Sequence, residues 1–283
     1  MQTIPSVLDL HGASWRDWIT ENLERRCDPE ELLNRMLKTT WKYEQAVLAL
    51  DEAMALLGMP PTTWRPRVPT IPDEDTIQLG ERVIRVLGRF SSPRAALLDG
   101  LLSAEECGNL IDYADSKGLN KSGVVDGATG ESIKHHARTS TSVFLTRAET
   151  PLIDTIEKRL SELTNWPISH GEGLQVLRYE AGQEYKPHFD WFDPKKPGSA
   201  NHLKRGGQRV GTTVIYLATP EEGGGTRFPK SGVQVYPRAG GALFFADVDV
   251  SGRPDEMSLH SGMPVVKGSK IVATYWQREG PFR

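Results

Sequence analysis

The sequence has little of what marks a disulfide-stapled or membrane-spanning protein. Its 283 residues contain only two cysteines, Cys27 and Cys107, too few and too far apart for a disulfide framework or a paired-cysteine zinc site. No stretch approaches the roughly 18 consecutive apolar residues of a membrane helix, and the first residues lack a basic segment followed by an apolar core. We therefore expect a cytoplasmic protein with no membrane partner.

The sequence also lacks an excess of charge of either sign. Lys and Arg number 34 against 37 Asp and Glu, a formal net charge of −3. No strong overall field favours nucleic acid or an anionic membrane surface, so we expect no nucleic-acid partner and argue any other partner from local sites. The length is sufficient for one large domain or two modest ones.

The N-terminal fifth has the pattern of packed helices. Between Ser14 and Leu57 apolar residues recur at intervals of three and four with charges between them, which is typical of amphipathic helices. Asp28 followed by Pro29 predicts the start of one of these helices. Five prolines then follow in residues 59–76, which favours an extended linker. We thus divide the chain into a helical region, 1–58, a linker, 59–76, and a domain, 77–283.

The remaining chain combines helices with many short strands. Ser103 and Glu106 form a predicted capping box that opens a helix ending near Lys117, and a second amphipathic helix is predicted over 149–163. After Trp166 the chain consists of short β-branched and aromatic runs separated by Gly, Pro and Asp, as expected for antiparallel strands. The predicted fold class is α+β, with a sandwich or barrel in the C-terminal part.

One motif within the strands can bind a metal. His188 and Asp190 are two residues apart, so on a strand both side chains point to the same side. A third ligand is available 72 residues later at His260. Two histidines and one carboxylate are the facial triad of Fe(II) oxygenases, and zinc accepts the same ligands.

A second candidate binding residue, Lys270, follows ten residues after His260. Alternation along a strand places Lys270, Val272, Thr274 and Trp276 on one face. If this face is the barrel interior, Lys270 is a buried cation that needs an anion, because an unpaired buried ammonium is costly. A dicarboxylate cosubstrate such as 2-oxoglutarate supplies one, with one end on the metal and the other on the lysine.

The order of motifs resembles the prolyl 4-hydroxylase family of Fe(II)/2-oxoglutarate dioxygenases. The resemblance rests on LRYEAGQEYKPHFD, QRVGTTVIYL, EEGGGTRFP, GALFFAD, SLHSGMPVVKGSK and ATYWQ, together with RTSTSVFL upstream. It covers roughly the last 190 residues and implies a double-stranded β-helix, or jelly roll, with its core at about 170–280. The resemblance does not extend to the N-terminal helices.

The resemblance implies roles for individual residues. Iron would be bound by His188, Asp190 and His260, and Lys270 would pair with the far carboxylate of 2-oxoglutarate, helped by the hydroxyls of Tyr179 and Thr226. The reaction implied is hydroxylation of a C–H bond with release of succinate and carbon dioxide, most simply at C4 of a prolyl residue in a peptide or protein. Ascorbate as a reductant is implied as well.

Substrate contacts are implied for three further residues, Tyr185, Arg209 and Trp276, which match positions of the peptide groove. The alternative for these residues is a core tryptophan and a solvated arginine at a strand end. The family often has a histidine two positions after the tryptophan, and here Arg278 stands there. Two other functions therefore stay open: hydroxylation of another side chain or a free amino acid, and a jelly-roll binding module without catalysis.

Three other features have simpler explanations. His135 and His136 are adjacent, and adjacent strand residues point to opposite faces, so we interpret them as part of a basic loop. The polar segments 120–138 and 193–208 are predicted to be mobile and to flank the active site. The Gly223–Gly225 run lacks the context of a nucleotide-binding loop. The N-terminal helices could form a homodimer, bind a target protein or support the barrel.

Overall fold

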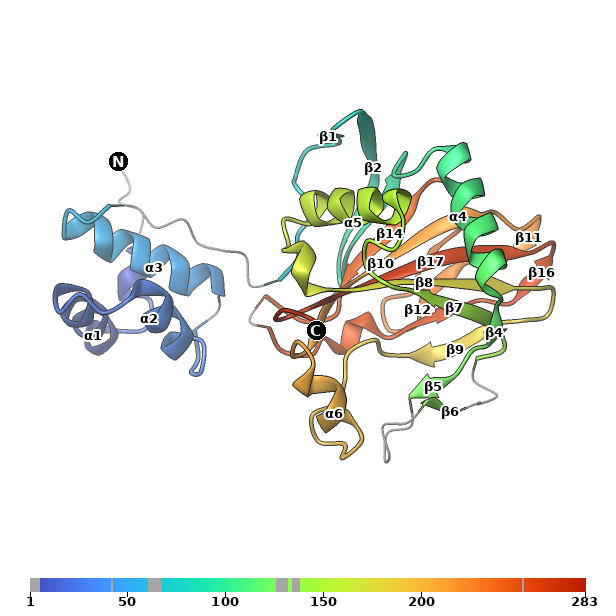
Figure 1. Ribbon diagram of the computed structural model, residues 1–283. Helices are drawn as coiled ribbons and strands as arrows, with labels where there is room; N and C mark the ends of the chain where they lie inside the picture. The colour runs from blue at the N-terminus through green and yellow to red at the C-terminus, as the bar shows by residue number, and fades with distance from the viewer. Residues whose placement is uncertain (1–5, 42, 61–67, 126–131, 134–137, 251) are drawn as a thin grey trace. The chain divides into compact units, whose positions relative to one another are not determined.

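The computed structural model describes residues 6–41, 43–60, 68–125, 132–133, 138–250 and 252–283. The chain divides into two compact units, Met1–Arg67 and Val68–Arg283 (Figure 1). The division lies within the proline-rich segment 59–76. Among the described residues, no helix has the length and apolar character required to cross a bilayer.

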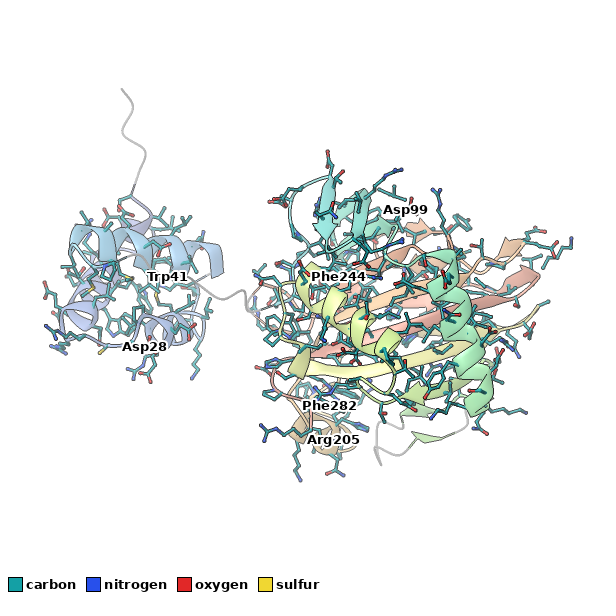
Figure 2. All side chains as sticks on the ribbon, turned by 45° about the horizontal axis from the view of Figure 1, so that its top comes forward. Asp28, Trp41, Asp99, Arg205, Phe244 and Phe282 are labelled. Carbon is teal, nitrogen blue, oxygen red and sulfur yellow. The ribbon has the colours of Figure 1, made fainter. Side chains whose placement is uncertain are left out.

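The first unit is a small helical bundle with its own core. It consists of a 3-10 turn η1 (Val7–Asp9) and helices α1 (Ala13–Glu24), α2 (Pro29–Met36) and α3 (Tyr43–Leu56). Asp28 caps α2 as predicted, because its side chain accepts a hydrogen bond from the backbone N–H of Glu30. The buried indole of Trp41 lies among the helices (Figure 2). The periodicity of the sequence thus predicted this unit correctly.

The second unit is built on a large antiparallel sheet. Its nine strands follow in spatial order as β1 (Thr76–Leu79), β2 (Arg82–Ser91), β3 (Arg94–Asp99), β14 (Ala242–Ala246), β10 (Arg209–Ala218), β17 (Lys270–Arg278), β8 (Gly171–Tyr179), β7 (Thr141–Leu145) and β4 (Asn120–Lys121). Each neighbouring pair is antiparallel. Strands far apart in sequence are therefore neighbours in space, as in a jelly roll.

Smaller sheets complete the second unit. One has four strands in the order β13 (Val233–Val235), β12 (Thr226–Phe228), β15 (His260–Gly262) and β9 (Tyr185–His188). Two short pairs join β11 (Glu222–Gly223) to β16 (Val265–Lys267) and β5 (Val124–Val125) to β6 (Ser132–Ile133). Side chains of the large sheet and of the four-stranded sheet form one buried cluster, so the two sheets pack face to face.

The other face of the large sheet is covered by two helices, α4 (Ala104–Lys117) and α5 (Pro151–Leu163) (Figure 1). Ser103 and Glu106 form the predicted capping box of α4. Helix α5 begins at Pro151, two residues later than predicted, because Thr150 is its N-cap. The layers are therefore helix, large sheet and small sheet, and the α+β class with a C-terminal jelly roll is confirmed.

Strand β17 runs through the centre of this arrangement and separates two environments. Ile271, Ala273 and Tyr275 belong to the apolar cluster under the helices. The alternate residues line a groove on the other face: Lys270, Val272, Thr274, Trp276 and Arg278. The alternation predicted from the sequence thus places Lys270 in the interior.

The two segments predicted to be mobile contain secondary structure. Segment 193–208 includes the short helix α6 (Ser199–Lys204), where the ring of His202 stacks on that of Phe192 with centroids 4.8 Å apart. Segment 120–138 includes β4, β5 and β6. Both segments contribute side chains to the groove described below, so they flank it as predicted, and their mobility stays a prediction. His135 and His136 lie outside the described residues.

Candidate metal centre and substrate groove

The topology brings the three predicted metal ligands together. His188 is the last residue of β9, Asp190 follows two residues later, and His260 is the first residue of β15. Strands β9 and β15 are antiparallel neighbours, and His188 and His260 are directly paired in their register. Their side chains therefore meet although 72 residues separate them in the sequence.

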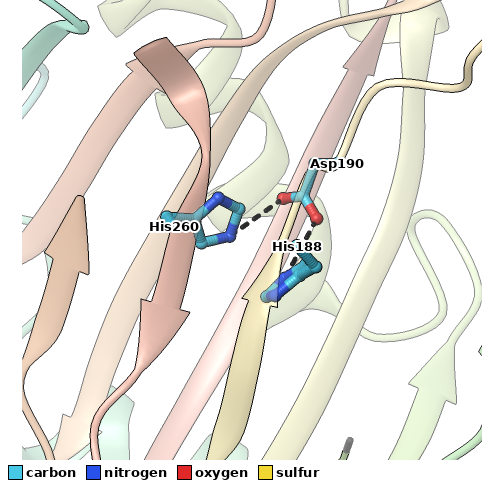
Figure 3. A group of neighbouring side chains, drawn as sticks. All are labelled: His188, Asp190 and His260. Carbon is cyan, nitrogen blue, oxygen red and sulfur yellow. Dashed lines mark ion pairs between the residues drawn. The ribbon is translucent and has the colours of Figure 1, made fainter. Parts of the chain in front are cut away.

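The ligand atoms of the triad converge on one point (Figure 3). The Nε2 atom of His188 lies 3.6 Å from Oδ1 of Asp190, and Nε2 of His260 lies 3.8 Å from Oδ2. One ligand atom from each of the three residues lies within 4.8 Å of the other two. A single ion between them can therefore contact all three.

Backbone carbonyls fix the tautomer of both histidines. Nδ1 of His188 is 2.8 Å from the carbonyl oxygen of Lys186, and Nδ1 of His260 is 2.9 Å from that of Ser258. Because a carbonyl oxygen only accepts, each Nδ1 must carry the hydrogen and donate it. Each Nε2 then has a free lone pair facing the other ligands, which is the form that binds a metal.

The electrostatics of the triad favour a bound cation. Burial, followed by the neighbouring His260, lowers the pKa of His188 to about 3, so its imidazole is neutral at physiological pH. Burial works to raise the pKa of Asp190, but the two imidazoles and Arg209 outweigh it and the pKa is lowered. The site therefore offers an uncharged His188 imidazole and an ionised Asp190 carboxylate as ligands.

Trp276, which the sequence assigned to the groove, and Thr212, which it did not reveal, hold Asp190 in place. Asp247, also not revealed by the sequence, lies behind Thr212. Its Oδ2 accepts hydrogen bonds from Nε1 of Trp276 and from Oγ1 of Thr212, both 2.9 Å away. The Thr212 hydroxyl also lies 2.8 Å from a carboxylate oxygen of Asp247. Burial and the charge of Asp190 raise the pKa of Asp247 well above its usual range, so a protonated Asp247 can donate to Thr212 while Thr212 donates to Asp190.

Lys270 occupies the other end of the interior. Its side chain is 4% exposed, and burial lowers its pKa to about 8. It faces the rings of Tyr179 and Tyr216, whose centroids are 5.7 and 5.9 Å from Nζ, and the hydroxyls of Tyr216 and Thr226 are 3.2 Å apart. No carboxylate among the described residues forms an ion pair with Lys270, so an anionic ligand would relieve an unpaired buried charge.

These two sites fit Fe(II) and 2-oxoglutarate. With three protein ligands, a bound Fe(II) would keep further coordination positions for a chelating keto acid and dioxygen. The unpaired lysine lies in the same groove as the triad, which is the arrangement a dicarboxylate needs. Tyr216 is a further member of the lysine site that the sequence did not single out.

The groove that holds both sites has a volume of about 1040 Å³, and the residues predicted to contact substrate line it. The Tyr185 ring stacks on the His188 ring with centroids 3.5 Å apart. The Arg209 guanidinium lies over Trp276, with Cζ 3.9 Å from the ring centroid. The indole N–H of Trp276 also donates a hydrogen bond to Asp190 of the triad, so Trp276 is more than a core-filling residue.

Arg209 is not a solvated strand end, because it is paired with a buried glutamate. Its Nε and Nη2 lie 2.6 and 2.9 Å from the carboxylate of Glu172, and Nε of Arg278 lies 2.6 Å from the same carboxylate. Burial opposes the charge of Glu172, but Arg209 and Arg278 outweigh it and lower its pKa. Burial lowers the pKa of Arg278 to about 10. Only the register of β8 against β17, and of β17 against β10, could have revealed this cluster.

Comparison with known proteins gives a consistent result. Residues 174–278 match the model of the 2OG-Fe(II) oxygenase superfamily, a span that includes the triad and Lys270. The chain is 41% identical to "Probable prolyl 4-hydroxylase 3" of Arabidopsis thaliana over 210 residues, 68% of this chain and 71% of that protein. It is likewise 41% identical to "Prolyl 4-hydroxylase 1" of the same plant over 203 residues, 66% of this chain and 70% of that protein.

A solved structure is also similar. The viral collagen prolyl hydroxylase of Paramecium Bursaria Chlorella virus-1, in its 2OG complex, superposes with a TM-score of 0.51 and 34% sequence identity. The match covers 64% of this chain and 94% of the viral chain. The helical unit lies outside the superfamily match.

Proposed function

The chain belongs to the prolyl 4-hydroxylase family of 2OG-Fe(II) oxygenases, and we propose that it hydroxylates C4 of a prolyl residue in a peptide or protein. It is a 2-oxoglutarate-dependent dioxygenase with Fe(II) as its metal. The observation that carries the proposal is the placement of a two-histidine, one-carboxylate triad and an unpaired buried lysine in one groove.

The residues of the two sites divide the work of binding the cofactors. His188, Asp190 and His260 hold the iron, and Lys270 binds the carboxylate of 2-oxoglutarate that is remote from the metal, with the hydroxyl of Thr226 beside it. Bound iron and 2-oxoglutarate would activate dioxygen, of which one oxygen atom converts C–H to C–OH and the other enters the succinate that forms as carbon dioxide is released. The chain itself contributes the orientation of these groups and the exclusion of water.

The groove residues position the substrate against the metal. The ring of Tyr185, stacked on His188, and the indole of Trp276 present apolar surfaces that suit a pyrrolidine ring. Arg209 keeps its orientation through Glu172, and its Nη1 lies near the backbone of Asp190. We propose that these three side chains hold the target residue so that one C–H bond faces the iron.

The test is a panel of proline-containing peptides incubated with Fe(II), 2-oxoglutarate and air. We expect a mass increase of 16 Da on proline and one succinate formed per hydroxylation. Hydroxylation of another side chain, or of free amino acids alone, would replace the prolyl assignment. Absence of succinate with every substrate would contradict the oxygenase function itself.

We also propose a compartment, a reductant and an oligomeric state for this protein. Cys27 and Cys107 are both free thiols, which supports a reducing compartment such as the cytoplasm. Ascorbate serves as a reductant that keeps the iron ferrous. The helical unit, with its separate core, forms a homodimer contact; light scattering of the full chain and of a variant without residues 1–58 tests this contact.

A further inference from the structure

The substrate groove carries the opposite charge to the chain as a whole. Seven cationic side chains line it against three carboxylates, Glu172, Asp190 and Asp193, whereas the whole chain has a net charge of −3. Two of these carboxylates are already engaged by protein partners: Glu172 by two arginines, and Asp193 by the backbone N–H of Lys195. Asp190 belongs to the metal triad.

Binding of Fe(II) and 2-oxoglutarate does not change the excess of positive charge in the groove. Fe(II) adds two positive charges and 2-oxoglutarate adds two negative charges, and Lys270 is matched by the remote carboxylate. Of the other cations, Arg209 and Arg278 share the single charge of Glu172. Most of the uncompensated positive charge therefore belongs to the rim of the groove, where Asp193 is the one carboxylate among the lining residues, rather than to the metal centre.

The rim cations come from two separate segments of the chain. Lys121 lies on β4, and Arg138 lies just before β7. Lys196 lies just before α6, and Arg205 follows it. Figure 1 shows β9, which ends at the triad, between α6 on one side and the β4–β5 region on the other. A peptide whose target residue reaches the iron therefore has rim cations near both of its flanks.

The four rim cations differ in how many interactions they already make with other groups of the protein. Arg138 donates to Gly123 and Gln175 and lies over the ring of Tyr185, but pairs with no carboxylate among the described residues. Arg205 donates to the carbonyl of Arg283 and lies over the ring of Phe282 (Figure 2). Lys121 and Lys196 are exposed, and neither has an ion pair within the part of the chain that the structure describes. The two lysines are thus free to bind a ligand's charge.

We infer that this groove selects peptides with Asp or Glu on both sides of the target residue. The inference rests on the proposed function and names the substrate class of the same site. Carboxylates at the flanks would neutralise the rim on docking, while the neutral target residue enters between Tyr185 and Trp276. Basic flanks would meet like charge on both sides, which disfavours the wrong partners.

Binding of matched peptides tests the inference without requiring turnover. Three labelled peptides share a central proline and carry two Glu, two Gln or two Lys residues on each side. Fluorescence anisotropy is measured anaerobically with Fe(II) and 2-oxoglutarate. Exposed ion pairs each contribute about 3-fold, so we expect the Glu peptide to bind about 10-fold more tightly than the Gln peptide and the Lys peptide to bind most weakly. The difference should shrink in 0.5 M salt, because such pairs are screened.

Charge reversal at the rim gives an independent readout. In the double variant Lys121→Glu/Lys196→Glu we expect the order of the Glu and Lys peptides to invert. Lys204→Glu is the matched control, because Lys204 is an exposed lysine of α6 that does not line the groove; it should keep the order found for the unmodified protein.

The outcomes separate this inference from the proposed function. Equal affinity for the three peptides, or an unchanged order in the double variant, overturns the selection of acidic flanks even if proline is hydroxylated. Tighter binding of a single-stranded oligonucleotide than of the Glu peptide overturns it as well. Preferential binding of the Glu peptide without any hydroxylation of proline supports the acidic class and contradicts the prolyl assignment instead.

Discussion

The two faces of the large sheet show how one set of strands serves both stability and chemistry. On the face under α4 and α5, the buried residues of β17 are Ile271, Ala273 and Tyr275. On the other face, the same strand presents Lys270, Trp276 and other residues of the groove. Because side chains alternate along a strand, these two environments are only one residue apart in the sequence.

The two faces differ in what burial does to the free energy. Under the helices, burial of apolar area stabilises the fold directly. In the groove, burial works against the charged forms of His188 and Lys270, whose pKa values it lowers to about 3 and about 8. We conclude that the buried ionisable groups of the groove face lower the free energy of unfolding but form a preformed binding site. The apolar contacts of the helix face offset this loss of stability. Substitutions on the two faces should therefore have different effects on activity and stability.

Loss of a triad residue should abolish activity but not folding. In His260→Ala the iron loses one of its three ligands, so succinate formation should fall to the background rate. The melting temperature of the metal-free protein should change little, because no apolar contact under the helices is lost. His170→Ala is the control, a histidine that packs on Trp166 outside the groove, and it should remain active. Retained activity in His260→Ala would contradict the role of the triad.

Truncation on the helix face should have the reverse effect. Ile156 of α5 is fully buried in the cluster under the helices, so Ile156→Ala should lower the free energy of unfolding by about 2–5 kcal/mol. Urea denaturation measures this loss, and kcat per folded molecule should stay unchanged. A large loss of kcat with normal stability would show that the two faces are not separable.

Removal of the buried lysine charge should affect binding and stability in opposite directions. Lys270→Met should raise the KM for 2-oxoglutarate by more than about 100-fold, as for a lost desolvated ion pair. The pKa shift from 10.5 to about 8 corresponds to about 3 kcal/mol, so the ligand-free variant should be more stable by up to that amount at pH 7. Lower stability of the ligand-free variant would contradict this account.

The same shift predicts a pH dependence of the ligand-free protein. Between pH 8 and 10.5 the unfolded chain keeps the Lys270 proton that the folded protein has lost, so the free energy of unfolding should rise with pH over this window. Affinity for 2-oxoglutarate should fall over the same window, because the neutral amine no longer pairs with a carboxylate. In Lys270→Met, neither the free energy of unfolding nor the affinity for 2-oxoglutarate should change with pH over this window. Urea denaturation at each pH measures the first quantity, and calorimetric titration with 2-oxoglutarate measures the second.

Weakening the support of Asp190 should have an intermediate effect. Trp276→Phe keeps an aromatic ring in the groove but removes the indole N–H that donates to Oδ2 of Asp190. Outer partners of metal ligands contribute about 10- to 100-fold to metal affinity, so Fe(II) should bind more weakly by that factor. Trp41→Phe in the helical unit should leave the affinity unchanged. Equal Fe(II) affinity in Trp276→Phe would show that this hydrogen bond does not position the ligand.

The smallest effect belongs to the solvent-exposed side of α5. Lys158 pairs with Asp154 at 2.6 Å, and its side chain is 67% exposed. Exposed pairs of this spacing contribute about 0.3–0.5 kcal/mol, so Lys158→Ala should change the free energy of unfolding by no more than that and leave activity intact. A loss above about 1 kcal/mol would mean that this exposed pair stabilises the fold more than exposed ion pairs ordinarily do.

Local patterns predicted a large part of this molecule. The cap at Asp28, the capping box at Ser103 and the strand face that Lys270 shares with Trp276 each follow from spacing over a few residues, and the structure shows all three. The convergence of His188 and His260 depended on a long-range register, and only the resemblance to a family made it an expectation.

Residues whose roles depend on non-local contacts were missed. Glu172, Thr212 and Asp247 act through partners on other strands of the sheet, and nothing near them in the sequence indicates those partners. Arg209 was assigned to the groove, but its ion pair with Glu172 could not be inferred. Helix α6 was missed because its six residues are too few for an amphipathic period.

The central claim is that His188, Asp190 and His260 share one ferrous ion that 2-oxoglutarate chelates. Anaerobic addition of Fe(II) and 2-oxoglutarate tests it most directly, by visible absorption. We predict a weak charge-transfer band that saturates at one iron per chain in the unmodified protein and is absent in His260→Ala. A band that persists in His260→Ala, or none in the unmodified protein, would contradict the claim.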